Sequence, residues 1–335
     1  MKTAFLTGGS GFVGANMARM LLAEGWEVRA LVRSSSDRRN LEGLALEIVE
    51  GDLNDPDLAA KIGPRDAVFH AAAHYSFFRS DGEAVMRSNV EGTRNVLAAA
   101  RAAGVGRTVY TSSVAAIGVK HGGIADETYQ SAPEDLIGTY KRSKYYAERE
   151  ALAAAAAGQE VVIVNPTTPI GPWDRKPTPT GDILVRFMTG NMPAIVRTGL
   201  NIVGVEDVVR GHLLAYERGR SGERYILGNE NLTLGALLQR VSDQTGRRAP
   251  RLTVPQWLPL GAAWFDERIL ARMGRVPKLS IDSVRMSQES MFYDASKAKD
   301  QLGFAPQPID DAIRAAVDWF ARNGYFGRER TTAWQ

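Results

Sequence analysis

The sequence predicts an α/β fold, a doubly wound parallel sheet with a smaller, mostly helical C-terminal lobe. Short β-branched runs alternate with helical patterns through the first two thirds of the 335 residues, as in parallel βαβ units. A glycine-rich turn joins the first run to the first helical pattern. After Pro166 the alternation gives way to prolines and glycines, in "NPTTPIGPWDRKPTPTG". We therefore expect a sheet domain over residues 1–166, regained at 203–228, and a lobe formed by 167–202 and 229–335.

Each expected strand of the first domain is a short apolar run that ends in a turn or a helical pattern. Helices are expected in "NMARMLLAEG" and "NVEGTRNVLAAARAAG", closed by Gly25 and Gly104, as C-terminal glycines commonly do. The expected strands are "KTAFLTG", "EVRALVR", "LEIVEGDL", "AVFHAAA", "RTVYTSS" and "EVVIVNP". The sheet is expected to regain the chain at "VGVEDVVRGHLLAYERG" and "ERYILG".

The C-terminal lobe is predicted to be covered by helices in "TLGALLQRVSDQTG", in the region from Trp257 to Arg275, and in "DDAIRAAVDWFARNG". Trp257, Trp264 and Phe265 have helix-like spacing. We predict that they form part of the core of this lobe, with the wall of an apolar substrate pocket as the alternative.

Composition excludes several classes of function. The 41 basic and 38 acidic residues leave a net charge of +3 without a long basic block, which indicates no nucleic-acid partner. The absence of cysteine excludes disulfides and suits a reducing cytosol. The four histidines, His70, His74, His121 and His212, show no metal-ligand spacing, so no metal site is predicted.

Targeting and membrane signals are also missing from the sequence. The N-terminal "MKTAFLTGGSG" lacks the apolar core of about 7 to 15 residues that a signal peptide needs. The later apolar segment "VPQWLPLGAAWF" contains two prolines and is shorter than the roughly 20 residues of a membrane span. We expect a cytoplasmic protein that does not cross a membrane.

The turn "TGGSGFVGANMARML" places Gly8, Gly11 and Gly14 three residues apart between a strand and a helix. Glycines at these points permit a tight turn, close approach of the backbone to a pyrophosphate, and close packing of helix on strand. The helix N-terminus supplies unpaired N–H groups. We therefore predict a Rossmann-type dinucleotide site. Its loop residues are Gly8, Ser10, Gly11, Phe12, Val13 and Gly14.

A basic residue stands where many dinucleotide enzymes carry an acid. That acid lies about 20 residues beyond the glycines and binds the ribose hydroxyls, whereas this chain has Arg33, followed by three serines. A guanidinium there favours NADP(H) over NAD(H); the alternative is a solvated loop in an enzyme that uses either cofactor. Asp52 and Leu53, after the third strand, are expected near the adenine, or else form an ordinary strand-end turn.

Tyr140 and Lys144 are four residues apart in "TYKRSKYYAE", so a helix projects them from one face. An ammonium can lower the pKa of the phenol, which then serves as acid or base at a substrate oxygen. Ser113, in "VYTSSVAAIG", can bond the same oxygen and stabilise the charge that develops on it. We predict that these three residues act together.

With these motifs the chain resembles the extended short-chain dehydrogenase/reductase family over nearly its whole length. The shared motifs are "TGGSGFVG", Asp52-Leu53, "HAAA", "NVEGT", the Ser-Tyr-Lys set, "NPTTPIGP", "VGVEDVV" and "SKAKDQLGF". "GWEVRALVR" is similar to the branch that joins dihydroflavonol-4-reductase-like reductases with hopanoid-associated sugar epimerases. Two features depart from relatives: "SSVAAIG" lacks the acid of nucleotide-sugar dehydratases, and Ile117 replaces an aromatic of the epimerases.

The resemblance implies roles for individual residues. It implies Tyr140 as general acid/base, Lys144 as its electrostatic partner and ribose ligand, and Ser113 as donor to the substrate oxygen. Six further positions are implied: Asn89 in support, Pro166 and Thr168 beside the nicotinamide, and Ala71, Ala72 and Ala73 beside the adenosine ribose. It also implies a homodimer formed through the "NVEGTRNVLAAARAAG" helix and the Tyr140 helix.

Three functional hypotheses follow. The first is an NADP(H)-preferring oxidoreductase that interconverts a carbonyl and a secondary alcohol on a small-molecule substrate. The alternative is an NAD(P)-dependent nucleotide-sugar or hopanoid-associated sugar epimerase that uses the same residues without net redox change. The third is a non-enzymatic dinucleotide sensor; such relatives typically lose the tyrosine or the lysine, and this chain keeps both.

Overall fold

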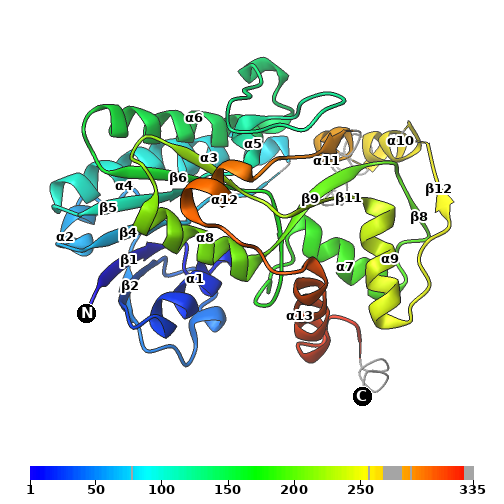
Figure 1. Ribbon diagram of the computed structural model, residues 1–335, viewed down its shortest axis with the longest axis horizontal. Helices are drawn as coiled ribbons and strands as arrows, with labels where there is room; N and C mark the ends of the chain where they lie inside the picture. The colour runs from blue at the N-terminus through cyan, green and yellow to red at the C-terminus, as the bar shows by residue number, and fades with distance from the viewer. Residues whose placement is uncertain (77, 256, 267–280, 287–288, 328–335) are drawn as a thin grey trace.

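A seven-stranded parallel sheet forms the centre of the larger domain in the computed structural model (Figure 1). The structure describes residues 1–76, 78–255, 257–266, 281–286 and 289–327. The strand order β10-β6-β5-β4-β1-β2-β3 reverses between β1 and β4, which opens a crevice at the carboxyl ends of these strands. The strands are β1 (Thr3–Thr7), β2 (Glu27–Val32), β3 (Glu47–Glu50), β4 (Ala67–His70), β5 (Arg107–Thr111), β6 (Val161–Pro166) and β10 (Arg224–Leu227).

Helices cover both faces of this sheet (Figure 1). Because both faces are covered, central strands are continuously apolar, and residues 161–164 of β6 are fully buried. This arrangement confirms the predicted doubly wound α/β fold. One face carries α1 (Phe12–Ala23), α8 (Val205–Arg218) and α12 (Ser296–Leu302); the other carries α2 (Leu58–Ile62), α4 (Gly92–Ala102) and α6 (Gly138–Ala156). The short α3 (Gly82–Met86) and α5 (Val114–Ile117) lie in the loops that follow β4 and β5.

The second lobe contains strands that the sequence did not predict. A four-stranded sheet is formed by β7 (Thr168–Ile170), β9 (Gly199–Gly204), β11 (Glu230–Thr233) and β13 (Ser290–Met291), and β8 (Ala194–Ile195) pairs with β12 (Leu252–Thr253). Residues 203–204 therefore end β9 in this second sheet, and the chain rejoins the first domain with α8 and β10. The helices of the lobe are α7 (Pro179–Thr189), α9 (Leu234–Thr245), α10 (Trp257–Phe265), α11 (Ile281–Met286) and α13 (Ile309–Arg322).

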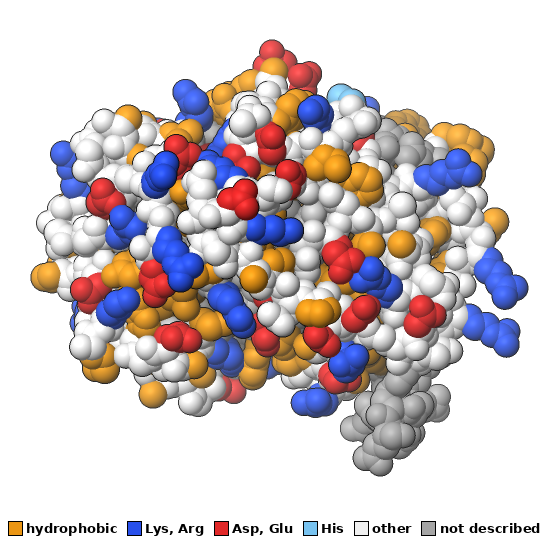
Figure 2. Space-filling model, in the orientation of Figure 1, with side chains coloured by type: hydrophobic (Ala, Val, Ile, Leu, Met, Phe, Trp, Pro, Cys, Tyr) orange, Lys and Arg blue, Asp and Glu red, His pale blue; other side chains and the backbone are white. Residues whose placement is uncertain are grey.

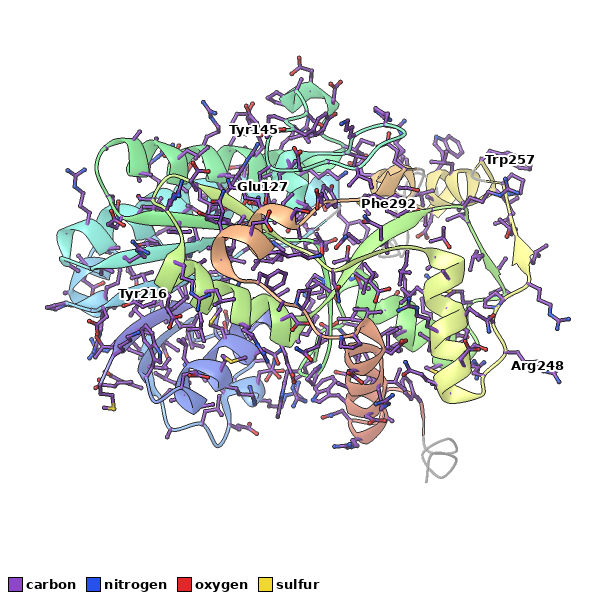
Figure 3. The ribbon with its side chains drawn as sticks, in the orientation of Figure 1. Glu127, Tyr145, Tyr216, Arg248, Trp257 and Phe292 are labelled. Atoms are coloured by element: carbon purple, nitrogen blue, oxygen red, sulfur yellow. The ribbon has the colours of Figure 1, made fainter. Side chains whose placement is uncertain are left out.

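The prediction that Trp257 and Trp264 lie in the core of this lobe is wrong. Their side chains are 68% and 55% exposed on α10, at the edge of the molecule where hydrophobic side chains gather in Figure 2, and Trp257 is labelled there in Figure 3. The apolar sequence of α10 indicated burial, but among its described side chains only that of Ala263 is buried. The side chain of Phe265 and residues 267–275 lie outside the described part of the chain.

Two histidines are part of the core of the first domain. His70, at the end of β4, lies 2.7 Å from the hydroxyl of Thr7 and 3.0 Å from that of Thr93. His212, on α8, lies 2.8 Å from the hydroxyl of Thr111. Burial lowers the pKa of His70 to about 3 and that of His212 to about 4. Both imidazoles are neutral at pH 7 and link secondary-structure elements.

We expect the stability of the protein to fall as the pH drops below about 6.5. The unfolded chain binds a proton at each histidine near that pH, whereas the folded chain resists protonation of His70 and His212 until near their lowered pKa values. Each histidine should therefore remove up to about 1.4 kcal/mol per pH unit from the free energy of unfolding. The free energy of unfolding can be measured in denaturant titrations between pH 7.5 and 5. His212→Gln should reduce its slope against pH by the contribution of one histidine, whereas His121→Gln, at a 79% exposed site, should leave the slope unchanged. Equal slopes for His212→Gln and the wild type would contradict this.

Candidate active site

The glycine turn touches the end of β4 through backbone atoms. Gly8 has φ of +74°, and a Cβ placed on it would lie 2.6 Å from the backbone nitrogen of Ala72. A Cβ on Gly14 would lie 2.1 Å from the carbonyl oxygen of Gly8. Gly11 precedes α1 and offers no side-chain cap, which leaves the first N–H groups of the helix for a ligand. This cradle fits a dinucleotide pyrophosphate.

The side chains of Ser10, Phe12 and Val13 are partly exposed in the same turn. Two asparagines that the sequence analysis missed join this turn to the segment after β7. The side-chain amide of Asn40 donates to the carbonyls of Ser10 and Trp173, at 3.1 and 3.2 Å. Asn16 donates to another carbonyl of that segment at 3.0 Å. No residue spacing could have revealed these links, because the partner carbonyls after β7 are more than 130 positions away.

Arg33 is exposed immediately after β2, at the corner where its prediction places it. Its neighbours in sequence are already paired: Arg38 with Glu50 at 2.5 Å, and Arg39 with Asp37 at 2.6 Å. Within the described ranges, Arg33 makes no salt bridge. Its guanidinium is therefore available to an anionic group at this corner.

Asp52 and Leu53 form the turn after β3. One carboxylate oxygen of Asp52 accepts hydrogen bonds from the backbone N–H and the side-chain amide of Asn54, at 3.0 and 2.8 Å. Leu53 packs closely on Gly92 at the start of α4. These contacts agree with the strand-end turn, one of the two alternatives for Asp52 and Leu53. Their contact with adenine stays a prediction.

Asn89 ties the segment after β4 to the helix that carries the predicted catalytic pair. It is 2% exposed; its oxygen accepts from the backbone N–H of His74 at 2.6 Å, and its amide donates to the His74 carbonyl at 3.0 Å. The same amide donates to the hydroxyl of Ser143, on α6, at 2.9 Å. Asn89 thereby holds the segment that contains residues 71–73 beside α6.

The structure brings Tyr140 and Ser113 together. Tyr140 lies in the first turn of α6, where the nearby side chain of Ser113 influences the pKa of its phenol. The Ser113 oxygen also accepts from the N–H of Ala115 at 3.1 Å. Burial raises the pKa of Tyr140 to about 12, and the Ser113 side chain opposes this rise. The sequence predicted a lowered pKa, but burial of the phenol dominates.

Lys144 is buried one turn further along α6, with 2% exposure. Its ammonium donates to the Thr111 carbonyl at 2.8 Å and to the Tyr110 hydroxyl at 3.3 Å, both on β5. Because an ammonium has three donors, one remains for a ligand. Burial lowers the pKa of Lys144 to about 8, and the negative charge of Glu148 acts in the opposite direction.

The two remaining predicted positions lie at the same edge of the first sheet. Pro166 ends β6, next to β5 in the sheet, and Thr168 begins β7 two residues later. The carboxyl ends of parallel strands meet at one edge, so Pro166 and Thr168 come close to the end of β5. The Thr111 carbonyl there accepts a hydrogen bond from Lys144.

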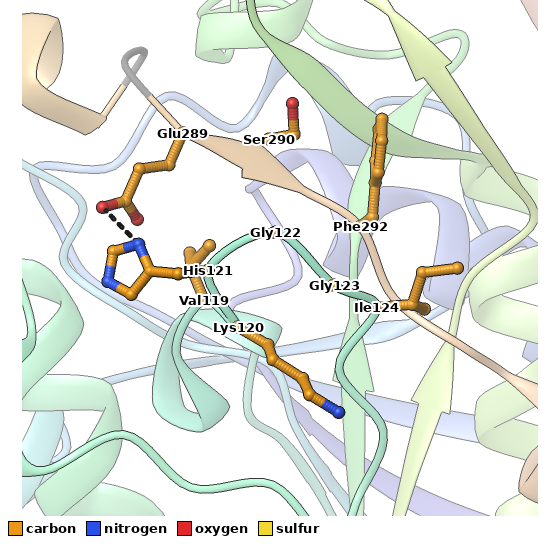
Figure 4. A pocket seen from close by; sticks show the side chains of 9 residues that line it. All are labelled: Val119, Lys120, His121, Gly122, Gly123, Ile124, Glu289, Ser290 and Phe292. Carbon is orange, nitrogen blue, oxygen red and sulfur yellow. Dashed lines mark ion pairs between the residues drawn. The ribbon is translucent and has the colours of Figure 1, made fainter.

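A hollow of about 460 Å³ lies beyond the C-terminal end of α5 (Figure 4). Residues 119–124 line one side, and Glu289, Ser290 and Phe292 line the other. The Nδ1 atom of His121 lies 3.3 Å from a carboxylate oxygen of Glu289. None of the predicted catalytic residues lines this hollow, so it is separate from the Ser-Tyr-Lys group.

Two further kinds of site are absent from the described residues. No group of three or more metal-ligating side chains is arranged around a common point. None of the helices there has both the length and the apolar character needed to cross a bilayer.

Comparison with known proteins agrees with this geometry. The sequence profile of the NAD dependent epimerase/dehydratase family matches residues 4–228. A Synechocystis protein provisionally named a dihydroflavonol 4-reductase is 57% identical over 96% of this chain and 95% of its own length. Sterol demethylase protein B of Methylococcus capsulatus is 36% identical over 96% of this chain and 99% of its own length. The crystal structure of gox2253 superposes with a TM-score of 0.86 at 44% identity, covering 98% of this chain and all of that one. The chain is an NAD(P)-dependent enzyme that belongs to the NAD dependent epimerase/dehydratase family.

Proposed function

We propose that the protein is an NADP(H)-preferring reductase that converts a carbonyl group of a small molecule to a secondary alcohol. The observation that carries the NADP(H) preference is the corner after β2, where Arg33 is exposed and makes no ion pair among the described residues, while Arg38 and Arg39 are paired. A ribose 2′-phosphate is the anion that this position suits. A bound nicotinamide dinucleotide would supply the hydride.

The chain's own residues would provide orientation and the proton. Tyr140 holds its phenolic proton at pH 7, since its pKa is about 12, and would deliver it to the oxygen of a carbonyl substrate. Ser113, whose side chain lies near the phenol, would donate to the same oxygen as negative charge develops there. Lys144 would bind a ribose hydroxyl with its third donor. A protonated phenol favours reduction, because oxidation must begin with a base.

The substrate that we propose is polycyclic and largely apolar. The relatives at 57% and 36% identity are named for a dihydroflavonol and for sterols, which are both polycyclic. The exposed, apolar side chains of Trp257 and Trp264 on α10 support an apolar substrate. Helix α10 packs on α11, which reaches the helix of Tyr140. Asp282 of α11 lies against Gly138, which begins the helix of Tyr140.

Replacing Arg33 with Ser tests the cofactor preference. Loss of a charge-assisted contact of roughly 1.5 to 3 kcal/mol should weaken NADPH binding by at least tenfold and leave NADH binding unchanged. Fluorescence titration with each nucleotide measures both effects. Arg39→Ser is the control, because that guanidinium is already paired with Asp37. Equal losses for both nucleotides in Arg33→Ser would contradict the proposed role.

A further inference from the structure

A buried carboxylate lies behind the candidate active site. Glu148 is 3% exposed on α6, one turn after Lys144 and two turns after Tyr140. One of its oxygens accepts from the Ser112 hydroxyl at 2.5 Å and from the Asn165 amide at 2.6 Å. The other accepts from the guanidinium of Arg224 at 2.9 Å. One side chain is therefore bonded to Ser112 just after β5, Asn165 in β6 and Arg224 at the start of β10.

These bonds fix both sides of Ser113. Ser112 precedes it in the chain, and the Asn165 amide that donates to Glu148 also donates to the Ser113 carbonyl at 3.0 Å. Since Glu148 belongs to the helix that carries Tyr140, the network sets the position of the serine hydroxyl relative to the phenol. We propose that Glu148 is a positioning residue of the active site, a carboxylate that holds Ser113 against α6. This inference rests on the proposed function of Ser113, Tyr140 and Lys144.

The network also stabilises the charge on Glu148. Arg224, in β10, is held by the carbonyls of Glu127 at 2.7 Å and Tyr129 at 3.0 Å. Its side chain is 15% exposed. A buried carboxylate is costly unless it is paired and hydrogen-bonded, and here both conditions hold. The carboxylate of Glu148 is therefore fixed in place by the elements on either side of it.

This anion acts on the ammonium of Lys144. The titratable and charged groups around Lys144 are Glu148 and the protonated Tyr140 on its own helix, Tyr110 on β5 and His70 on β4. His70 is neutral, and burial raises the pKa of Tyr110 above its usual value, so its phenol is neutral too. Glu148 is thus the negative charge in this group, and it opposes the lowering of the Lys144 pKa by burial.

Replacing Glu148 with Gln tests the proposal, because glutamine keeps the shape and removes the charge. At pH 6.5, where Lys144 stays protonated, NADPH affinity should change less than twofold. At pH 8.5 it should fall about fivefold or more, as the Lys144 pKa drops. Turnover of a dihydroflavonol should fall about 10- to 100-fold even at pH 6.5, because Ser113 is misplaced, with little change in KM for NADPH. Glu148→Asp should restore the pH profile of binding.

Glu150→Gln is the matched control. Glu150 lies on the same helix and makes a bidentate pair with Arg94, at 2.9 and 2.7 Å, on the surface. Its loss should leave the pH profile and turnover unchanged. A wild-type binding profile and wild-type turnover in Glu148→Gln would overturn the proposal. A loss of NADPH affinity and turnover that is equal at every pH and persists in Glu148→Asp would also overturn it, since that result indicates a structural role only. NADPH binding needs no substrate, so absence of turnover in the wild type would count against the proposed function alone.

Discussion

Replacing Tyr140 with Phe is expected to reduce turnover by a factor of about 10² to 10⁴. The phenol is the proposed proton donor of the site and is protonated at pH 7, and phenylalanine keeps the ring without the hydroxyl. NADPH affinity should stay within about threefold of the wild type, because the glycine turn and Lys144 remain in place. Steady-state kinetics with NADPH and a dihydroflavonol, together with a fluorescence titration, measure both quantities.

Tyr146→Phe is the control for this experiment. Tyr146 lies on the same helix and is 41% exposed, so its hydroxyl should contribute nothing to turnover. Turnover by Tyr140→Phe within tenfold of the wild type would show that another group supplies the proton. A parallel loss in Tyr146→Phe would indicate that damage to α6 causes both effects.

Replacing Gly8 with Ala is expected to abolish dinucleotide binding and to destabilise the fold. The added methyl would lie 2.6 Å from the nitrogen and 2.7 Å from the Cα of Ala72, and both are backbone atoms. No side chain can rotate away to relieve this clash, so the turn or the end of β4 must move. The backbone also has φ of +74°. Left-handed backbone and overpacking together should cost roughly 2 to 5 kcal/mol, which thermal or denaturant unfolding would measure.

Gly25→Ala separates the effect of left-handed backbone from the effect of overpacking. Gly25 has φ of +76°, and nothing lies within 4 Å of a Cβ placed on it. This variant should therefore lose only about 1 to 2 kcal/mol from the left-handed backbone and should bind NADPH like the wild type. Normal NADPH binding by Gly8→Ala would show that the turn does not approach a bound nucleotide closely.

The first domain could be predicted from the sequence because its signals are local. The β-branched runs, the closing glycines and the turn with Gly8 and Gly14 each specify one element and its neighbour. Strands of the second lobe were missed because most of them are short; β7 has three residues and β13 two, too few for any periodicity. The exposed Trp257 shows a further limit, since apolar helix composition does not say which face is covered.

The candidate site follows the same rule. Tyr140 and Lys144 were found from their spacing on one helix, and Glu148, four residues further along, could have been found in the same way. The groups that hold Lys144 could not, because Thr111 and Tyr110 lie 33 and 34 residues away and meet it only through the fold. The raised pKa of Tyr140 depends on burial, which the spacing of residues does not show.

The most direct test of the account is a fluorescence titration of the purified protein with NADPH and with NADH, after analysis of the denatured supernatant for carried-over nucleotide. We predict a supernatant without bound nucleotide and a binding constant for NADPH at least tenfold tighter than that for NADH. Retained NAD, or tighter binding of NADH, would contradict the proposed reductase and favour an epimerase that keeps its cofactor through the reaction.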